Sequence, residues 1–218
     1  MTKWLWIVAG PNGAGKTTHT AKLIAKLQAA GATDADIIKL NADERTAELR
    51  THFPDKPQNE LNLQAAQETD AALEKCIADG KKAIFVETVL SSTKYQDDVL
   101  DAKARGYNVG LIFVSVHPPE LILGRIKTRV AQGGHNVDDQ KALDRYKRSH
   151  ENLVWFAQHV DRLFILDNSS RETGPVLVAM KEAGRKLTQK IKGQNPALDH
   201  AIRAVQKNKP KSPALNAV

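Results

Sequence analysis

Residues 10–17 read Gly10-Pro11-Asn12-Gly13-Ala14-Gly15-Lys16-Thr17, and they decide the fold of this 218-residue chain. They match the pattern G-x-x-x-x-G-K-[ST] in full, between an apolar strand expected over 4–9 and a helix expected over 16–30. Glycines let such a loop wrap tightly and direct backbone N–H groups at phosphate oxygens. The start of the following helix adds a positive dipole end. The predicted ATP-binding residues are Gly10, Pro11, Asn12, Gly13, Ala14, Gly15, Lys16, Thr17 and Thr18.

Two side chains of this loop are expected to contact the triphosphate and its metal. Lys16 is expected to reach the β- and γ-phosphates, and the hydroxyl of Thr17 to bind Mg²⁺. A glycine turn followed by a chance lysine would explain neither the complete motif nor its place between a strand and a helix. The sequence therefore predicts ATP and Mg²⁺ as cofactors, without saying what is done with the triphosphate.

Short apolar runs alternate with helical patterns along the chain, and each run is expected to form a strand. The five runs lie at 4–9, 36–40, 83–86, 109–116 and 163–166. Continuous apolar strands that alternate with helices are typical of a parallel sheet with both faces covered. The sequence predicts a three-layer α/β domain, a P-loop fold with a five-stranded parallel sheet and a helical lid over about 125–148.

Composition and charge narrow the class of protein. An apolar share of 41% excludes a wholly disordered chain, and the sequence contains no run of 18 apolar residues that would predict a membrane span. The single cysteine, Cys76, excludes a disulfide framework and favours a reducing cytoplasm. Residues 1–180 carry equal numbers of acidic and basic side chains, so the net charge of +7 arises after them. Binding of nucleic acid by the main domain is therefore not expected.

The C-terminal part is expected to divide at about residue 192. Residues 175–191 have a helical pattern, and the expected domain comprises residues 1–192. The Pro, Asn and Lys content of 193–218 predicts a flexible basic tail, with room for one helix over 196–206.

Polar side chains follow the second and third expected strands, at the edge of a parallel sheet where ligands bind. Asp43 would stand beside the phosphate loop, where a carboxylate can accept the proton of an attacking hydroxyl, although it could equally cap the next helix. Glu87 and Thr88 follow the third strand. A carboxylate there can hold Mg²⁺ through water, anchor a polar substrate, or simply be solvated. Ser91 could cap a helix or contact substrate.

Two pairs of arginines flank a glycine-rich break. Arg125 and Arg129 are four residues apart and Arg145 and Arg148 three apart, so each pair shares a helix face. Such a helix–loop–helix can close over a triphosphate and neutralise charge on the transferred group. The alternative is a solvated helix pair in which nearby aspartates bind the arginines.

Together these residues resemble the zeta toxin family of small P-loop kinases, in its shorter bacterial branch. The resemblance runs in the family's order across about residues 4–170, and beyond the phosphate loop it rests on short pieces of sequence. These pieces are Asn41-Ala42-Asp43-Glu44, Glu87-Thr88 with Leu90-Ser91, Arg129 with Gly133-Gly134-His135-Asn136-Val137, Arg145-Tyr146-Lys147-Arg148-Ser149 with Asn152-Leu153, and Asp167-Asn168-Ser169.

The resemblance implies an ATP-dependent kinase of the 3′-hydroxyl of the sugar in UDP-N-acetylglucosamine or a related UDP-sugar. It also implies a small antitoxin protein as a partner. The implied catalytic residues are Lys16, Asp43 as the base, Arg129, Arg145 and Arg148. The implied substrate-binding residues are Asp43, Glu87, Thr88, Ser91 and His135, and the implied metal ligands are Thr17 and Glu87.

Two other functions remain open: a P-loop kinase of a nucleoside or other small metabolite, and a P-loop ATPase that drives a partner protein. The ATPase is disfavoured because the chain has no Leu-Ser-Gly-Gly signature, and its third strand ends Val86-Glu87-Thr88 instead of in paired Asp-Glu. A nucleic-acid kinase or binder is disfavoured by the neutral main domain and by an aromatic share of only 5%.

Overall fold

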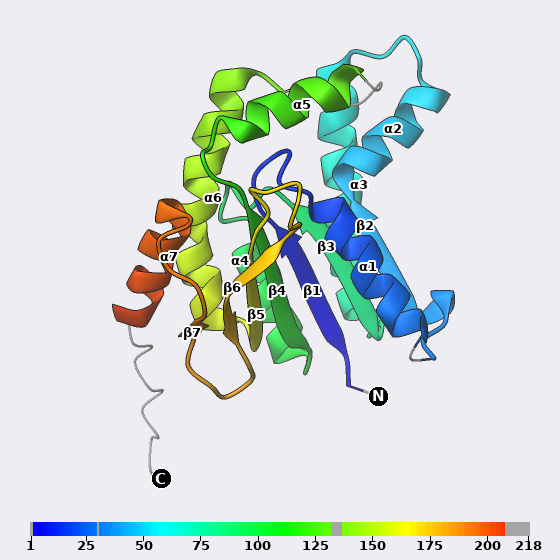
Figure 1. Cartoon of the computed structure of the whole chain (residues 1–218). Coiled ribbons are helices and arrows are strands. Elements are labelled where there is room, and N and C mark those ends of the chain that lie inside the picture. The colour runs from blue at the N-terminus through cyan, green and yellow to red at the C-terminus, as the bar shows by residue number, and fades with distance from the viewer. Residues whose placement is uncertain (1, 30, 132–136, 208–218) are drawn as a thin grey trace.

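The computed structural model describes residues 2–29, 31–131 and 137–207, which form a seven-stranded sheet flanked by helices (Figure 1). The strand order is β2-β3-β1-β4-β5-β6-β7. The five parallel strands are β1 (Trp4–Ala9), β2 (Ile37–Asn41), β3 (Ala83–Thr88), β4 (Asn108–Ser115) and β5 (Arg162–Asp167). The antiparallel strands β6 (Val176–Lys181) and β7 (Thr188–Gln189) extend the sheet beyond β5. The predicted α/β class is confirmed.

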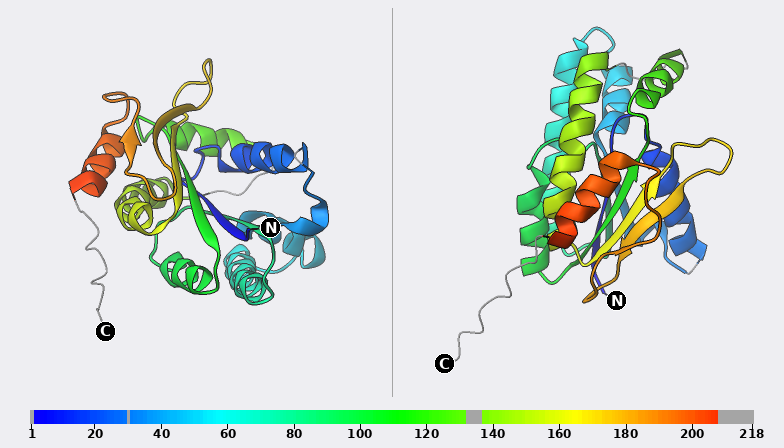
Figure 2. Two further views of the ribbon diagram at one scale, coloured as in Figure 1. Left: turned by 90° about the horizontal axis from the view of Figure 1, so that it is seen from below. Right: turned by 60° about the vertical axis from the view of Figure 1, so that its left-hand side comes forward.

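Helices cover both faces of the sheet, which gives three layers (Figure 2). The helices are α1 (Lys16–Ala29), the short 3₁₀ helix η1 (Asp34–Asp36), α2 (Ala42–His52), α3 (Gln58–Ala78), α4 (Tyr95–Ala104), α5 (Leu121–Ala131), α6 (Asp139–His159) and α7 (Pro196–Lys207). The main core lies between the sheet and helices α3, α4 and α6. Helix α1 packs on the opposite face. Within the described residues, no helix is both long and apolar enough to cross a membrane.

Aromatic side chains cover the sheet beside α1. Trp6 of β1 lies over Gly110 of β4, where a Cβ atom would come within 2.2 Å of the indole ring. The ring stacks on Trp4, with centroids 5.1 Å apart, and on Phe164 of β5, with centroids 6.2 Å apart. Because residue 110 is a glycine, the Trp6 indole can pack directly against the backbone of β4.

The helix predicted over 175–191 is wrong, because this segment forms β6, a turn and β7. Strand β6 begins Val176-Leu177-Val178-Ala179, a β-prone run that pairs antiparallel with β5 and buries Val178 and Ala179. The pairing satisfies the outer edge of β5, so tertiary context overrides the helical pattern. The predicted five parallel strands are thus joined by two more.

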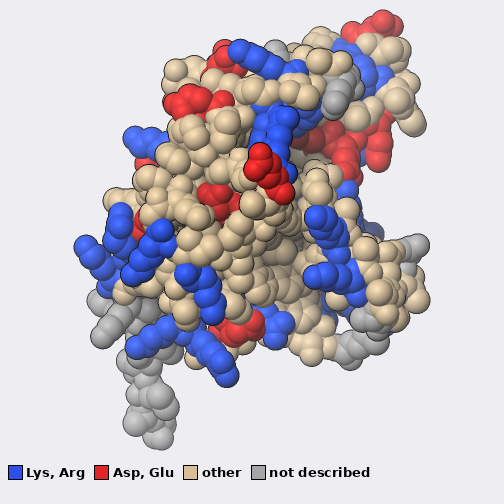
Figure 3. Space-filling view, in the orientation of Figure 1, with Lys and Arg blue, Asp and Glu red and all other residues tan. Residues whose placement is uncertain are grey.

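The helix expected over 196–206 is present as α7, but it is folded onto the domain. Leu198, Ala201 and Ile202 are fully buried in the main core. The boundary predicted at 192 therefore lies too early, and the domain continues to Lys207; residues 208–218 lie outside the described part. Figure 3 shows basic side chains gathered over α7 and the neighbouring β6–β7 segment, consistent with the charge excess after residue 180.

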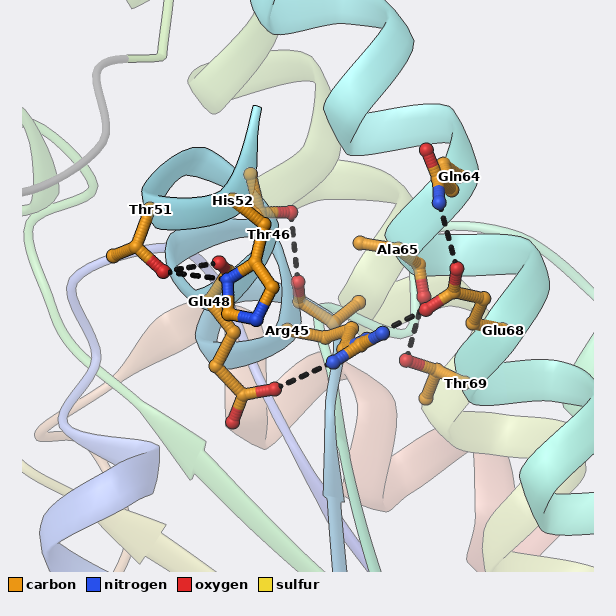
Figure 4. Close-up of polar contacts among 10 residues, drawn as sticks. Arg45, Thr46, Glu48, Thr51, His52, Gln64, Ala65, Glu68 and Thr69 are labelled. Carbon is orange, nitrogen blue, oxygen red and sulfur yellow. Dashed lines mark hydrogen bonds and ion pairs between the residues drawn. The ribbon is translucent and has the colours of Figure 1, made fainter. Parts of the chain in front are cut away.

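Helices α2 and α3 project together beyond the sheet, and Arg45 ties them to each other (Figure 4). Its Nε donates to Glu68 Oε2 of α3 at 2.5 Å, and its Nη1 donates to Glu48 Oε2 at 2.8 Å. Gln64 in turn donates to Glu68 Oε1 at 2.8 Å. This network joins the first half of α2 to α3, and so helps to fix the helix whose first turn carries Asp43.

Candidate active site

The phosphate loop connects the central strand β1 to α1, and its backbone has conformations that only glycine adopts readily. Gly10 has φ +138°, and a Cβ atom there would lie 2.0 Å from the carbonyl oxygen of Val114. Lys16 begins α1 and points back into the loop, where its Nζ donates to Gly10 O at 3.0 Å and to Pro11 O at 3.1 Å. The ammonium group therefore lies where the motif predicts a phosphate-binding lysine.

Three strand and helix ends meet at Glu87. The Oε2 atom of Glu87 accepts hydrogen bonds from Thr17 Oγ1 at 2.9 Å and from Asn41 Nδ2 at 3.1 Å. Glu87 is buried, which excludes the solvated strand end considered from the sequence. Its Oε1 atom is also buried and has no hydrogen-bond partner among the described residues.

This arrangement fits a magnesium ion. Mg²⁺ binds hard oxygen ligands such as a hydroxyl, a carboxylate and water. Thr17 and Glu87 supply a hydroxyl and a carboxylate in contact, and the unpartnered Glu87 oxygen leaves room for a further interaction. A buried carboxylate oxygen without a partner is costly, and a bound cation or its water would satisfy it.

Asp43 lies in the first turn of α2 but does not cap it. The cap is Asn41, whose Oδ1 accepts from the backbone N–H of Asp43 at 2.9 Å and from that of Glu44 at 3.4 Å. The capping role considered for Asp43 is therefore wrong. Its side chain is 62% exposed, and its Oδ2 lies 3.6 Å from Nη1 of Arg129 on α5.

The charges of these residues act on one another. Burial lowers the pKa of Lys16 from its ordinary value to about 8, although Asp43 and Glu87 raise it; Arg129 lowers it further. Two carboxylates and two cations from α1, α2, β3 and α5 thus lie within electrostatic reach at one end of the sheet. A site with this balance can bind a polyanion and still hold a base next to it.

The lowered pKa of Lys16 predicts how ATP binding depends on pH. The lysine is cationic below about pH 8 and neutral above it, so affinity for ATP is retained below this pH and lost above it. We expect the dissociation constant of ATP to rise about fivefold between pH 8 and pH 9. Fluorescence titration at several pH values measures it.

A matched control is Lys16→Arg, since a guanidinium stays charged over this range. Its ATP affinity should not follow the same pH curve. A constant ATP affinity of the wild-type protein between pH 7 and pH 9.5 would contradict the assignment.

Arg125 contacts the phosphate loop, although the residues predicted to bind ATP or substrate do not include it. Its Nη1 donates to Gly13 O at 3.3 Å and its Nη2 to Asn168 O at 2.7 Å, while Asn168 Nδ2 donates to Ala14 O at 2.8 Å. The phosphate loop, α5 and the loop after β5 are thereby joined. Its four-residue spacing from Arg129 was the available signal. A pocket of about 360 Å³ adjoins this junction, lined by Gly13, Gly15, Arg125, Thr128, Arg129, Asn168, Ser170, Arg171 and Gly174.

The remaining predicted residues that the structure describes lie at the end of β3, on the loop between β3 and α4, or on α6. Thr88 Oγ1 accepts from Leu90 N at 3.1 Å, and Arg148 Nε donates to Ser91 O at 3.2 Å. Arg148 therefore braces the loop that follows Glu87. Arg145, half-buried on α6, makes no hydrogen bond or ion pair with the described residues. His135, with the rest of 132–136, lies outside the described residues.

The aspartates near the arginines have other partners. Asp138 caps α6 by accepting from Lys141 N at 2.9 Å, Asp139 lies 3.8 Å from Lys127, and Asp144 accepts from Gln140 at 2.9 Å. These contacts do not support the alternative in which the aspartates bind the arginine pairs.

Comparison with solved structures shows the same fold in distant proteins. A chain of the AvrRxo1-ORF1:-ORF2 complex with ATP superposes with a TM-score of 0.68 at 17% identity, over 87% of this chain and 61% of that one. The same complex with sulphate ions gives 0.69 at 17% identity, over 96% and 66%. A chain of the PezAT chromosomal toxin–antitoxin system of Streptococcus pneumoniae gives 0.56 at 15% identity, over 97% and 81%. The present chain thus spans less than two thirds of the AvrRxo1 chains.

These likenesses show that the chain shares its α/β fold with those proteins. Comparison with curated protein sequences gives no match. Residues 5–153 match the family described as AAA domain. This match begins in β1, includes the phosphate loop and reaches α6, so it spans most of the chain and all of the charged cluster around Lys16. The chain belongs to this AAA domain family.

Proposed function

We propose that the protein is an ATP-dependent kinase of a small hydroxyl-bearing molecule, and that the acceptor is UDP-N-acetylglucosamine or a related UDP-sugar. The single observation that carries the kinase proposal is the placement of Asp43 within electrostatic reach of Lys16, with its exposed carboxylate 3.6 Å from Arg129. A pure ATPase needs a bound water beside the triphosphate. An exposed carboxylate next to the cleft instead suits a larger acceptor alcohol.

The chemistry follows from these positions. The acceptor oxygen attacks the γ-phosphorus of ATP, the bond from that phosphorus to the bridging oxygen of ADP breaks, and the acceptor proton passes to Asp43. Lys16 and Arg129 stabilise the negative charge on the transferred group. Mg²⁺, held by Thr17 and Glu87, would neutralise the triphosphate. Water must be excluded during transfer, and we assign this task to the described parts of the predicted lid, residues 125–131 and 137–148.

The identity of the acceptor rests on the resemblance to zeta toxins. Support comes from the fold likeness to a chain of the PezAT toxin–antitoxin system and to the AvrRxo1-ORF1:-ORF2 complexes. By the same reasoning we propose a small antitoxin protein as a partner and the cytoplasm as the place of reaction.

The test incubates the protein with ATP, Mg²⁺ and UDP-N-acetylglucosamine, and follows the mass of the sugar nucleotide. We expect a product one phosphate heavier, and none when Mg²⁺ is chelated. Parallel reactions contain other UDP-sugars or nucleosides. If a nucleoside is phosphorylated and no UDP-sugar is, the proposed acceptor is wrong and the proposed kinase activity stands. ATP hydrolysis without a phosphorylated acceptor in the whole panel would contradict the kinase proposal.

A further inference from the structure

The loop that ends in α7 reaches back to the nucleotide end of the sheet through one buried side chain. Asn195 is 2% exposed, and its Nδ2 donates to Asp167 Oδ2 at 2.7 Å and to Ser115 Oγ at 3.3 Å. Its Oδ1 accepts from Leu198 N at 3.2 Å and so caps α7. The C-terminal helix is therefore attached to the carboxyl ends of β4 and β5.

The hydrogen-bond network fixes which way the Asn195 amide points. His150 Nδ1 lies 2.8 Å from the carbonyl oxygen of Tyr146, so this nitrogen carries the hydrogen. Its Nε2, 2.8 Å from Ser115 Oγ, then accepts the serine hydroxyl hydrogen. Burial lowers the pKa of His150 to about 4, which agrees with a neutral ring. With its hydrogen used, Ser115 can only accept from Asn195.

Asp167 connects Asn195 to the loop that follows β5, beside the phosphate loop. Its second carboxylate oxygen, Oδ1, accepts from Ser169 N at 2.8 Å, and Ser169 Oγ accepts from His117 N at 2.7 Å. Asn168 lies between Asp167 and Ser169 in the chain. Its side chain donates to Ala14 O of the phosphate loop, and its backbone oxygen accepts from Arg125. Asn195 is thus connected to the phosphate loop through its hydrogen bond to Asp167, the backbone of residues 167–169 and the hydrogen bond from Asn168 to Ala14 O.

We propose that Asn195 is a positioning residue of the nucleotide site. It orients Asp167, and thereby holds residues 168–171 against the phosphate loop where Asn168, Ser170 and Arg171 line the pocket. The inference rests on the proposed binding of ATP at this loop. It assigns a role in the nucleotide site to a residue that lies well outside the matched residues 5–153.

The test uses the pairing of one amide with one carboxylate. Asn195→Leu leaves Asp167 Oδ2 without its donor, and Asn195→Asp places two carboxylates against each other. Either change should raise the dissociation constant of ATP about tenfold. Adding Asp167→Asn to Asn195→Asp exchanges the two groups, since position 167 can still accept from Ser169 N and position 195 can still cap α7. The double variant should bind ATP more tightly than Asn195→Asp alone but less tightly than wild type, because it restores the amide–carboxylate pair and not the hydrogen bond to Ser115 Oγ.

A control separates positioning from general loss of stability. Ile202→Ala removes a buried side chain from the same helix without touching Asp167, so it should lower the unfolding temperature and leave ATP affinity unchanged. Hydrogen exchange of the backbone amides of 168–171, measured without ATP, should quicken in Asn195→Leu and not in Ile202→Ala. If Asn195→Leu does not fold, the test uses Asn195→Asp and the double variant Asn195→Asp with Asp167→Asn instead.

Several results would overturn the inference. These are unchanged ATP affinity in both single variants, failure of the double variant to recover, or an equal loss of affinity in Ile202→Ala. Failure of the wild-type protein to bind ATP would refute the proposed function instead. In that case the exchange rates alone decide whether Asn195 holds the loop.

Discussion

Lys16→Ala should lower the rate of phosphoryl transfer from ATP by about 10³-fold, because the variant loses the cation that lies inside the phosphate loop. Lys16 Nζ is held at the loop by Gly10 O and Pro11 O, and so is placed before the nucleotide arrives. A truncated side chain removes both this placement and the charge that opposes the triphosphate. The measurement is the rate of formation of phosphorylated sugar nucleotide at saturating acceptor.

The matched control is Lys22→Ala, which removes an exposed lysine from the same helix. It changes the net charge by the same amount and should keep the wild-type rate. Circular dichroism should show that both variants are folded. A Lys16→Ala rate within about tenfold of wild type would refute the role of this lysine in transfer.

The phosphate loop and its strand and helix could be predicted because their information is local. Lys16 and Thr17 follow Gly10 within seven residues. The backbone conformation of these same residues sets where the two side chains lie. The apolar runs also predicted five parallel strands, since strands buried on both faces need continuous apolar sequence. No long-range contact had to be known for either prediction.

The C-terminal elements could not be predicted in this way. The pattern over 175–191 is compatible with a helix, and only the free edge of β5 decides that Val176–Lys181 becomes a strand. In the same way, Asn195 looks like a loop residue in the sequence. Its partners Ser115 and Asp167 are 80 and 28 residues away, and they become neighbours only after β4 and β5 are paired.

In the candidate site, too, the sequence predicts individual residues but not their long-range partners. Strand ends indicated Asp43 and Glu87, because carboxyl ends of parallel strands share one edge of the sheet. The partner of each depends on tertiary structure: Thr17 reaches Glu87 across 70 residues, and Arg129 reaches Asp43 only because α5 crosses toward α2. Asn41 belongs to the motif Asn41-Ala42-Asp43-Glu44, and in the structure it both caps α2 and donates to Glu87. One residue thus sets the positions of both carboxylates.

Asp43→Asn should lower the rate of transfer by about 10²–10⁴-fold, the range expected on removing a general base. The amide has nearly the shape of the carboxylate and leaves the Asn41 cap intact, because only the backbone N–H of residue 43 takes part in it. ATP affinity should be unchanged or slightly higher, since a negative charge near the triphosphate is removed. Transfer rate and ATP binding are measured on the same protein.

The control is Glu44→Gln on the adjacent residue, whose carboxylate pairs with Lys39 at the edge strand. This variant should keep the wild-type rate. Equal rates in Asp43→Asn and Glu44→Gln would remove Asp43 from the mechanism.

Asp43 could act directly on the acceptor, or only by holding Arg129 at 3.6 Å, and a double-mutant cycle distinguishes the two. If Asp43 acts only through Arg129, then adding Asp43→Asn to Arg129→Met lowers the rate no further than Arg129→Met alone. A general base contributes whether or not the arginine is present, so we expect the two losses to multiply. The exposure of the Asp43 carboxylate favours this result, because an acceptor alcohol can reach that side chain from solvent.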